Sequence, residues 1–238
     1  RWFGRRPNDT CEVQAVEPHM EQEAPPAFYM TPSADGSRRG MYVINTYDPA
    51  SPHLHRLAAT TFHEAVPGHH FQQAIEQELE GTPDFRRFGA RLAAGSFIEG
   101  WALYTEQFAR EMGLYRTPLE DFGALETEAW RAARLVVDTG IHAFGWTRQQ
   151  SIDLLIERAG LSRLEAETET DRYISWPGQA LSYMIGQREI LSLRDQLEAR
   201  DGDRFDHQAF HDQVIGHGSL ALRVLREQLP GWVRPKAD

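Results

Sequence analysis

Cysteine, long apolar runs and basic clusters are scarce in this chain of 238 residues. The single thiol, at Cys11, cannot form an intrachain disulfide, so the fold does not depend on cross-links. The absence of an apolar run of 18 residues excludes a membrane-spanning helix. Acidic residues outnumber basic ones by 35 to 25, which gives a net charge of −10. Nucleic-acid-binding proteins usually carry a basic face, so we expect no nucleic-acid partner.

The most informative stretch is 63–70, which reads HEAVPGHH. A His-Glu pair opens the usual zinc-peptidase motif, in which two histidines bind zinc and the glutamate activates a water molecule. In that motif the second histidine follows the first by four residues. Here Pro67 occupies that position, and the next histidines are His69 and His70.

A straight α-helix brings neither of these histidines to His63. Each residue adds ~100° of rotation and ~1.5 Å of rise, so His69 would lie on nearly the opposite face and His70 ~10.5 Å along the axis. Pro67 cannot donate a hydrogen bond to the carbonyl of His63, and Gly68 can adopt conformations closed to other residues. We therefore predict a helix break at 66–68 that returns one later histidine toward His63. The alternative is a helix that simply ends at Pro-Gly.

A candidate third ligand follows about thirty residues later, in the stretch 97–106, FIEGWALYTE. Zinc peptidases with two histidines and one glutamate take that glutamate from a following helix. Glu99 has this position, and it lies in an apolar run where a carboxylate needs a partner. Glu106 falls on the same helix face and could accept a hydrogen bond from a ligating histidine. A solvated glutamate on an amphipathic helix is the alternative for Glu99.

Four blocks in this order resemble the DUF885 family of bacterial proteins, which is similar to zinc metallopeptidases and has the recurring motif HExxPGH. The blocks are HEAVPGHH at 63–70, EGWALYTE at 99–106, DTGIH at 138–142 and PGQALSYMIGQ at 177–187. The resemblance covers nearly the whole chain but only the C-terminal part of the family protein. Because the chain also begins at Arg1, we expect a fragment, with the missing N-terminal part as a possible wall of the cleft.

The resemblance implies a zinc-dependent peptidase that acts on a peptide or a small amide. By it, His63, His69 and Glu99 bind Zn²⁺ and Glu64 is the general base, with His70 as the less favoured ligand. The resemblance implies a bacterial protein, cytoplasmic or exported, and no signal peptide is visible in the chain.

A zinc peptidase also needs a hydrogen-bond donor for the oxyanion. Tyr183, in the last of the four blocks, and His142 are the candidates. Asp138 precedes His142 by four residues, so the two could meet on one helix face. A buried structural role is the alternative for both. Three further histidines are expected at the surface or the edge of the cleft, with a second metal site as the alternative: His207, His211 and His217.

Two arginines are candidates for pairing with a carboxylate of the substrate, which would suit a carboxypeptidase or a dipeptidase. They are Arg134 and Arg188, and a surface or structural role is the alternative for both. Glu128 is a further candidate for supporting a metal ligand.

The predicted fold is mainly α-helical and zincin-like, with a small β-hairpin or edge strand near the N-terminus. We expect an N-terminal extended segment with the hairpin at 1–50 and a helical metallopeptidase-like region at 51–238, together forming one domain. The hairpin turns at Asp35-Gly36, and Met41–Asn45 is the candidate edge strand for binding the substrate backbone. Residues 1–26 show no periodicity.

Helices are expected from Ser51 onward, where serine and proline form a start signal. Threonine or serine caps and Pro or Gly stops place the other boundaries. The expected helices cover roughly 51–80 with the break, 88–112, 117–144, 147–159, 162–175, 178–199, 206–215 and 219–228.

Three other functions remain compatible with these residues. A homologue that kept the fold and lost catalysis would bind metal, or act as a scaffold, without hydrolysis. A non-haem iron enzyme also uses two histidines and one carboxylate, although it has no need of a glutamate next to the first histidine. A metal-dependent hydrolase of other amides or esters would differ only in its substrate.

Overall fold

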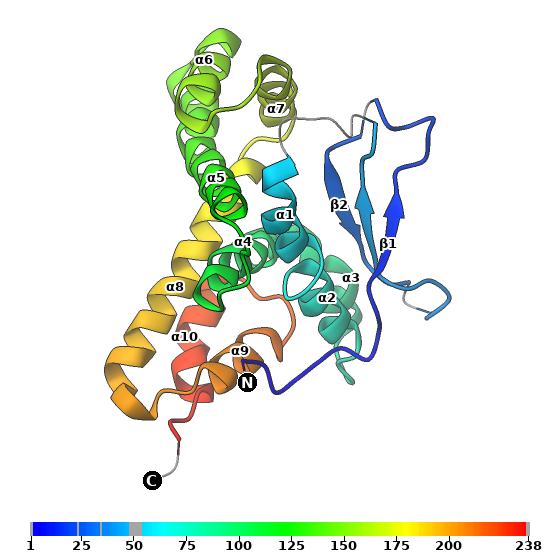
Figure 1. Ribbon diagram of the computed structural model, residues 1–238. Helices are drawn as coiled ribbons and strands as arrows, with labels where there is room; N and C mark the ends of the chain where they lie inside the picture. Colours follow the sequence, from blue (N-terminus) through cyan, green and yellow to red (C-terminus); the bar gives the residue numbers. More distant parts are fainter. Residues whose placement is uncertain (1, 23, 34, 48–53, 237–238) are drawn as a thin grey trace.

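The structure is a computed structural model that describes residues 2–22, 24–33, 35–47 and 54–236 (Figure 1). This part of the chain is mainly helical with a small three-stranded sheet, as predicted. The expected helix start at Ser51 and the expected boundary between residues 50 and 51 lie outside the described residues. Within the described ranges, every helix is too short or too polar to cross a membrane.

The sheet contains β1 (Glu12–Ala15), β2 (Ala27–Met30) and β3 (Met41–Ile44). β2 and β3 pair antiparallel, as the hairpin prediction requires. β1 pairs in parallel with β3, and the strand order is β1-β3-β2. The prediction that β3 is an edge strand was therefore wrong: β3 is central, and β2 is the outer strand beside α1 (Figure 1).

The error has its origin in β1. Its sequence, EVQA, alternates polar and apolar residues, a weak strand signal that the prediction for residues 1–26 did not use, but all four side chains are exposed, so none of them marks a buried face. Its backbone pairing with β3 is what makes it a strand. In contrast, Met41, Tyr42 and Val43 are buried, which suits a strand with a neighbour on each side.

The helices follow the predicted order, and the differences are local. The stretch 88–112 forms two helices that meet at Ala94, and 178–199 begins with a short 3₁₀ turn at Gln179–Leu181. The bounds are α1 (Leu57–Glu64), α2 (His69–Gln77), α3 (Asp84–Ala93), α4 (Gly95–Glu111), α5 (Pro118–Phe144), α6 (Arg148–Ala159), α7 (Arg163–Ser175), α8 (Ser182–Asp201), α9 (His207–Ile215) and α10 (Leu222–Trp232); further 3₁₀ turns are Leu54–Arg56 and Gly202–Arg204.

Capping side chains fix three of these starts. Ser162 forms the capping box that its spacing to Glu165 predicts, and Thr147 forms another with Gln150. Thr117 accepts a hydrogen bond from the backbone N–H of Glu120, but the Glu120 side chain accepts from Arg116 rather than closing the box on Thr117.

Helices α4 and α8 cross at two glycines, and this crossing positions the candidate site. A Cβ on Gly100 would overlap the backbone of Gly186, and a Cβ on Gly186 would overlap the carbonyl of Ser96. Because neither residue has a side chain, the two backbones approach directly. Glu99 precedes Gly100 on α4, and Tyr183 lies three residues before Gly186 on α8. The close crossing therefore brings the segments that carry Glu99 and Tyr183 together.

His211 belongs to the core and not to the surface, contrary to the prediction. It is fully buried, its Nε2 lies 2.7 Å from the hydroxyl of Tyr104, and its Nδ1 lies 2.9 Å from the carbonyl oxygen of Trp2. The rings of Phe3 and Phe108 also pack against it. A histidine among charged neighbours in sequence looks exposed, and only the aromatic residues brought from distant segments bury it.

Burial lowers the pKa of His211 to about 3, against about 6.5 in an unfolded chain. The unfolded chain therefore takes up this proton first as the pH falls. We expect His211 to contribute stability that is full above pH 6.5 and is lost as the pH falls toward 3, worth on the order of a few kcal/mol at about 1.4 kcal/mol per unit. Urea unfolding from pH 7 to 4 should show a steeper loss for wild type than for His211→Gln. The exposed His19→Gln control should keep the wild-type slope.

Candidate metal centre

The predicted helix break is present. α1 ends at Glu64, α2 begins at His69, and the Val66-Pro67 peptide bond between them is cis. A Cβ on Gly68 would overlap the carbonyl oxygens of Phe62 and His63, so the chain folds back tightly onto the end of α1. Only glycine fits this approach. The ring centroids of His63 and His69 consequently lie 4.8 Å apart.

Helix α4 satisfies backbone carbonyls at the break. The indole N–H of Trp101 donates to the carbonyl of Pro67 at 2.9 Å, and the hydroxyl of Thr105 contacts the carbonyl of Phe62 at 3.0 Å. Buried carbonyls without partners are costly, so these bonds stabilise the broken form. Sequence reasoning missed both roles, although both residues lie within the block EGWALYTE.

Three side chains from α1, α2 and α4 converge at this point. Oε2 of Glu99 lies 3.3 Å from Nε2 of His69 and 3.6 Å from Nε2 of His63. His63 and His69 are buried, and the Glu99 side chain is largely so. Glu64 joins the group, since its carboxylate and the two imidazoles offer ligand atoms within 4.8 Å of one another. These are the residues that the sequence nominated.

The spacing suits a tetrahedral metal ion. Ligands bound to zinc at 2.0–2.1 Å are about 3.3–3.4 Å apart along the edge of a tetrahedron. The buried polar atoms that lack a hydrogen-bond partner in the described part include two at this centre, Oε2 of Glu99 and Nδ1 of His69. A buried carboxylate oxygen that faces two imidazole nitrogens needs a positive charge nearby, and a metal ion bound by all three groups would supply it. The donor set therefore fits zinc.

His70 points away from this group. Its Nδ1 lies 3.0 Å from the hydroxyl of Tyr29, and its Nε2 lies 3.2 Å from the carbonyl oxygen of Asp9. Both ring nitrogens thus have partners outside the centre. Of the two histidines that follow Pro67, His69 is the one that the structure brings to His63.

Glu106 supports His63 from behind, as the sequence suggested. Its Oε1 lies 2.7 Å from Nδ1 of His63, and its Oε2 accepts a 2.7 Å hydrogen bond from Thr127. Burial opposes protonation of His63, but the hydrogen bond to Glu106 and the carboxylates of Glu99 and Glu64 outweigh it and raise the pKa of His63 to about 10. The centre therefore favours a positive charge, which a proton or a metal ion can supply.

We expect Glu106→Gln to weaken zinc binding by about 10- to 100-fold, because the carboxylate orients His63 and increases its basicity. Competition with a chromophoric chelator measures the affinity. Glu111→Gln is the matched control, since Glu111 lies on the same helix and pairs with Arg194. Equal zinc affinity in wild type and Glu106→Gln would contradict the role assigned to Glu106.

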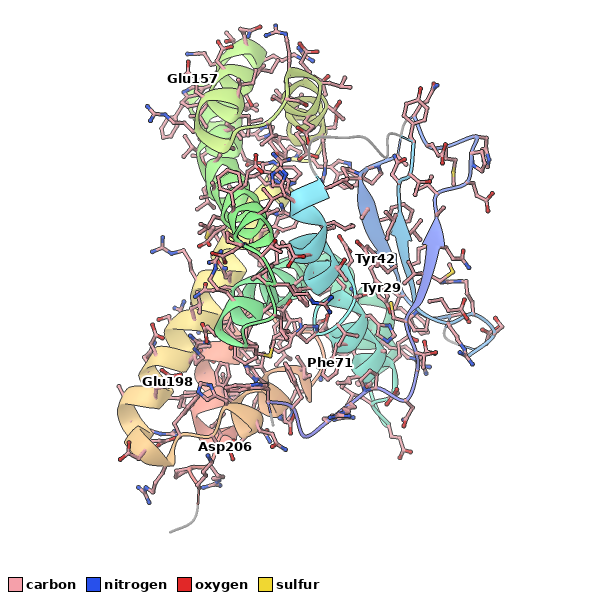
Figure 2. The ribbon with its side chains drawn as sticks, in the orientation of Figure 1. Tyr29, Tyr42, Phe71, Glu157, Glu198 and Asp206 are labelled. Atoms are coloured by element: carbon pink, nitrogen blue, oxygen red, sulfur yellow. The ribbon has the colours of Figure 1, made fainter. Side chains whose placement is uncertain are left out.

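Glu64 occupies the last turn of α1, and its side chain is partly exposed. Tyr42 on β3 lies nearby: burial raises the pKa of Tyr42, and the Glu64 carboxylate adds to that effect. Figure 2 shows Tyr42 and Tyr29 where the sheet meets α1 and α2. Glu64 thus lies next to the histidine pair without being locked in a hydrogen bond that the structure records.

Tyr183 also lies at the centre. Its ring stacks on that of His63 with the centroids 6.0 Å apart. Its hydroxyl oxygen accepts hydrogen bonds from Arg172 at 3.2 Å and Gln179 at 3.4 Å. Since both partners are donors, the hydroxyl hydrogen of Tyr183 is left to donate elsewhere.

The structure does not bring His142 to the centre. It is exposed, and its Nε2 contacts the carbonyl of Tyr173 at 2.9 Å. The predicted partner, Asp138, instead accepts the backbone N–H of Gly178. Asp138 and His142 do lie four residues apart on one helix, as predicted. The Asp138 carboxylate, however, accepts the Gly178 N–H and not a hydrogen bond from His142. Two other candidates, Arg188 and Glu128, are also exposed.

Comparison with known protein families identifies one match. Residues 1–229 match the family model described as "Bacterial protein of unknown function (DUF885)". No curated protein matches the chain at a significant level. Two similar solved structures are described as putative lipoproteins, one from Colwellia psychrerythraea and one, of unknown function, from Shewanella oneidensis.

The first of these shares 41% identity and a TM-score of 0.93, and the match covers 98% of this chain and 39% of that one. The second shares 25% identity and a TM-score of 0.79, and the match covers 96% of this chain and 42% of that one. The chain thus spans about two fifths of each relative. Because the family match extends over nearly all of its residues, the chain belongs to the DUF885 family, bacterial proteins of unknown function.

Proposed function

We propose that this chain carries the metal centre of a zinc-dependent, zincin-like peptidase. The observation that supports the proposal most strongly is the convergence of Nε2 of His63, Nε2 of His69 and Oε2 of Glu99, with distances of 3.3 and 3.6 Å from the carboxylate oxygen to the two nitrogens. His63, His69 and Glu99 would hold the ion. A bound zinc ion would lower the pKa of a water molecule and polarise the scissile carbonyl.

Three side chains around the centre would perform the remaining steps of peptide hydrolysis. Glu64 accepts a proton from the attacking water on its carboxylate and passes it to the departing amine nitrogen. The Tyr183 hydroxyl donates to the oxyanion as it forms. Glu106 holds the ring of His63 in place through Nδ1.

A peptide substrate is favoured by the neighbouring strand. β2 is the outer strand on the side of the sheet next to α1, and Tyr29 in this strand packs against His69 with ring centroids 6.5 Å apart. An extended peptide can add to such a strand through backbone hydrogen bonds. β2 therefore replaces β3 as the strand proposed to bind the substrate backbone.

The same three ligands would also suit a non-haem iron centre. The position of Glu64 favours zinc hydrolysis, since its carboxylate lies within 4.8 Å of the histidine ligand atoms, where a general base is required. The two structural relatives are described as lipoproteins, so we further propose that the protein works in the bacterial cell envelope.

Peptide cleavage tests the proposal. The purified chain, loaded with zinc, should cleave members of a mixed fluorogenic peptide library, lose this activity with a chelator and regain it when zinc is returned. Parallel assays with esters and small non-peptide amides separate a peptidase from a more general hydrolase. Zinc binding without turnover of any of these substrates would instead indicate a non-catalytic member of the family.

A further inference from the structure

Three arginines gather around Tyr183. The guanidinium carbons of Arg134 and Arg131 lie 4.5 and 5.9 Å from the centre of the Tyr183 ring. Arg172 donates to the Tyr183 hydroxyl. Arg131 and Arg134 are 7% and 2% exposed, whereas the Arg172 side chain is 30% exposed. Arg172 is thus the member of this arginine cluster that a ligand can reach.

The carboxylates around the arginine cluster do not balance its charge. Glu169 pairs with two of the three, at 2.9 Å from Arg134 and 3.4 Å from Arg172. Arg131 has Glu106 at 3.9 Å, beyond hydrogen-bond distance, and Glu106 already serves His63 and Thr127. Three positive charges against two negative ones leave an excess of one positive charge. Uncompensated charge in a buried region is costly, which favours an anionic ligand.

Hydrogen-bond donors in the arginine cluster are also in excess. Nε and Nη1 of Arg131 and Nη1 of Arg134 are buried and have no hydrogen-bond partner in the described part of the chain. Both guanidinium groups pack against the Trp130 ring, with each guanidinium carbon 4.5 Å from the ring centre. Packing on the Trp130 ring stabilises the two guanidinium cations, but the ring offers their N–H groups no hydrogen-bond acceptor. Carboxylates are the acceptors that match the guanidinium fork.

We propose that Arg172, with Arg131 and Arg134 behind it, forms a binding site for a carboxylate of the substrate. The inference rests on the proposed peptidase function and narrows its substrates to peptides with a free carboxylate near the scissile bond. Tyr183 connects the two sites, since its ring contacts His63 and its hydroxyl contacts Arg172. An extended peptide advances roughly 3.3–3.6 Å per residue, so a few residues span the Tyr183 side chain that separates His63 from Arg172.

The carboxylate can be the C-terminus of the peptide or an acidic side chain, and three probes distinguish these sources. We would use one fluorescein-labelled tripeptide with a free C-terminal carboxylate, the same peptide as its C-terminal amide, and the amide with glutamate as the last residue. Fluorescence anisotropy on the zinc-loaded Glu64→Gln chain measures binding without turnover. A peptide that binds only as the free acid identifies the C-terminus, and recovery by the glutamate peptide identifies a side-chain site.

We expect the carboxylate peptides to bind about 10- to 100-fold more tightly than the neutral amide, which is the range for hydrogen bonds to a charged group. Arg172→Gln should remove this difference, and Arg172→Lys should restore part of it because the charge remains. Arg163→Gln is the control, since Arg163 lies on the same helix with an exposed side chain and pairs with Glu167. It should retain the full preference.

The carboxylate site and the peptidase function fail in different ways. Equal binding of acid and amide peptides, no binding of any of the three, or equal losses in Arg172→Gln and Arg163→Gln would overturn the carboxylate site. Hydrolysis by the wild-type chain without a preference for carboxylates would leave the peptidase function standing. A carboxylate preference in binding without hydrolysis would leave the site standing and overturn the peptidase function.

Discussion

Glu64→Gln is expected to reduce peptide hydrolysis by about 10²- to 10⁴-fold, the range for losing a general base, while zinc content stays at the wild-type level. Glutamine has nearly the same shape as glutamate but cannot accept the proton. The side chain is partly exposed at the end of α1, so the substitution should leave the folded structure intact. Initial rates and elemental analysis on the same preparation provide both measurements.

The same variant distinguishes two assignments of the third ligand. Glu64 and Glu99 both lie close to the histidine pair, but Oε2 of Glu99 is buried and lies within 3.6 Å of both Nε2 atoms. Loss of zinc from Glu64→Gln would make Glu64 a ligand and contradict its role as base. Glu128→Gln, a substitution on exposed α5 surface, is the control and should change neither rate nor zinc content.

Gly68→Ala is expected to destabilise the protein by up to roughly 3 kcal/mol and to disrupt zinc binding. The new Cβ would overlap the carbonyl oxygens of Phe62 and His63, which are backbone atoms and cannot move aside cheaply. The adjustment would shift His69, the next residue, away from His63. Urea unfolding and zinc titration of the same samples measure the two effects.

The control for this variant is Gly89→Ala, in the middle of α3. A Cβ there meets no atom within 4 Å, and alanine is favoured over glycine inside a helix by about 1 kcal/mol. Replacing glycine by alanine should therefore stabilise the protein at position 89 and destabilise it at position 68. A Gly68→Ala chain as stable as wild type, with unchanged zinc affinity, would show that the tight approach at Gly68 is dispensable.

Sequence reasoning located the centre because its chemistry is concentrated in short motifs. Pro67 and Gly68 predict a helix break by their backbone properties alone, and Glu99 stands out as a carboxylate in an apolar run. The sequence could not decide between His69 and His70 by geometry, since the direction of the chain after a break is set by packing. Trp101 and Thr105, which hold the break in place, look like ordinary helix residues.

The other features that the sequence did not predict have one cause in common. Each depends on contacts with residues that are distant in sequence. β1 is a strand because β3 lies beside it, and its own four residues are too few and too exposed to predict a strand by themselves. His211 is buried because Trp2 and Phe3 reach it from the other end of the chain. The charge excess of the arginine cluster appears only when α5, α7 and α8 meet around Tyr183.

The zinc content of the purified chain tests the central claim most directly. Elemental analysis of wild type, Glu99→Ala and the exposed control Glu128→Ala should follow dialysis against a slight excess of zinc. We predict about one zinc ion per chain in wild type and control, and almost none in Glu99→Ala, which loses the carboxylate that faces both histidines. No zinc in the wild type, or equal zinc in wild type and Glu99→Ala, would contradict the metal centre proposed for His63, His69 and Glu99.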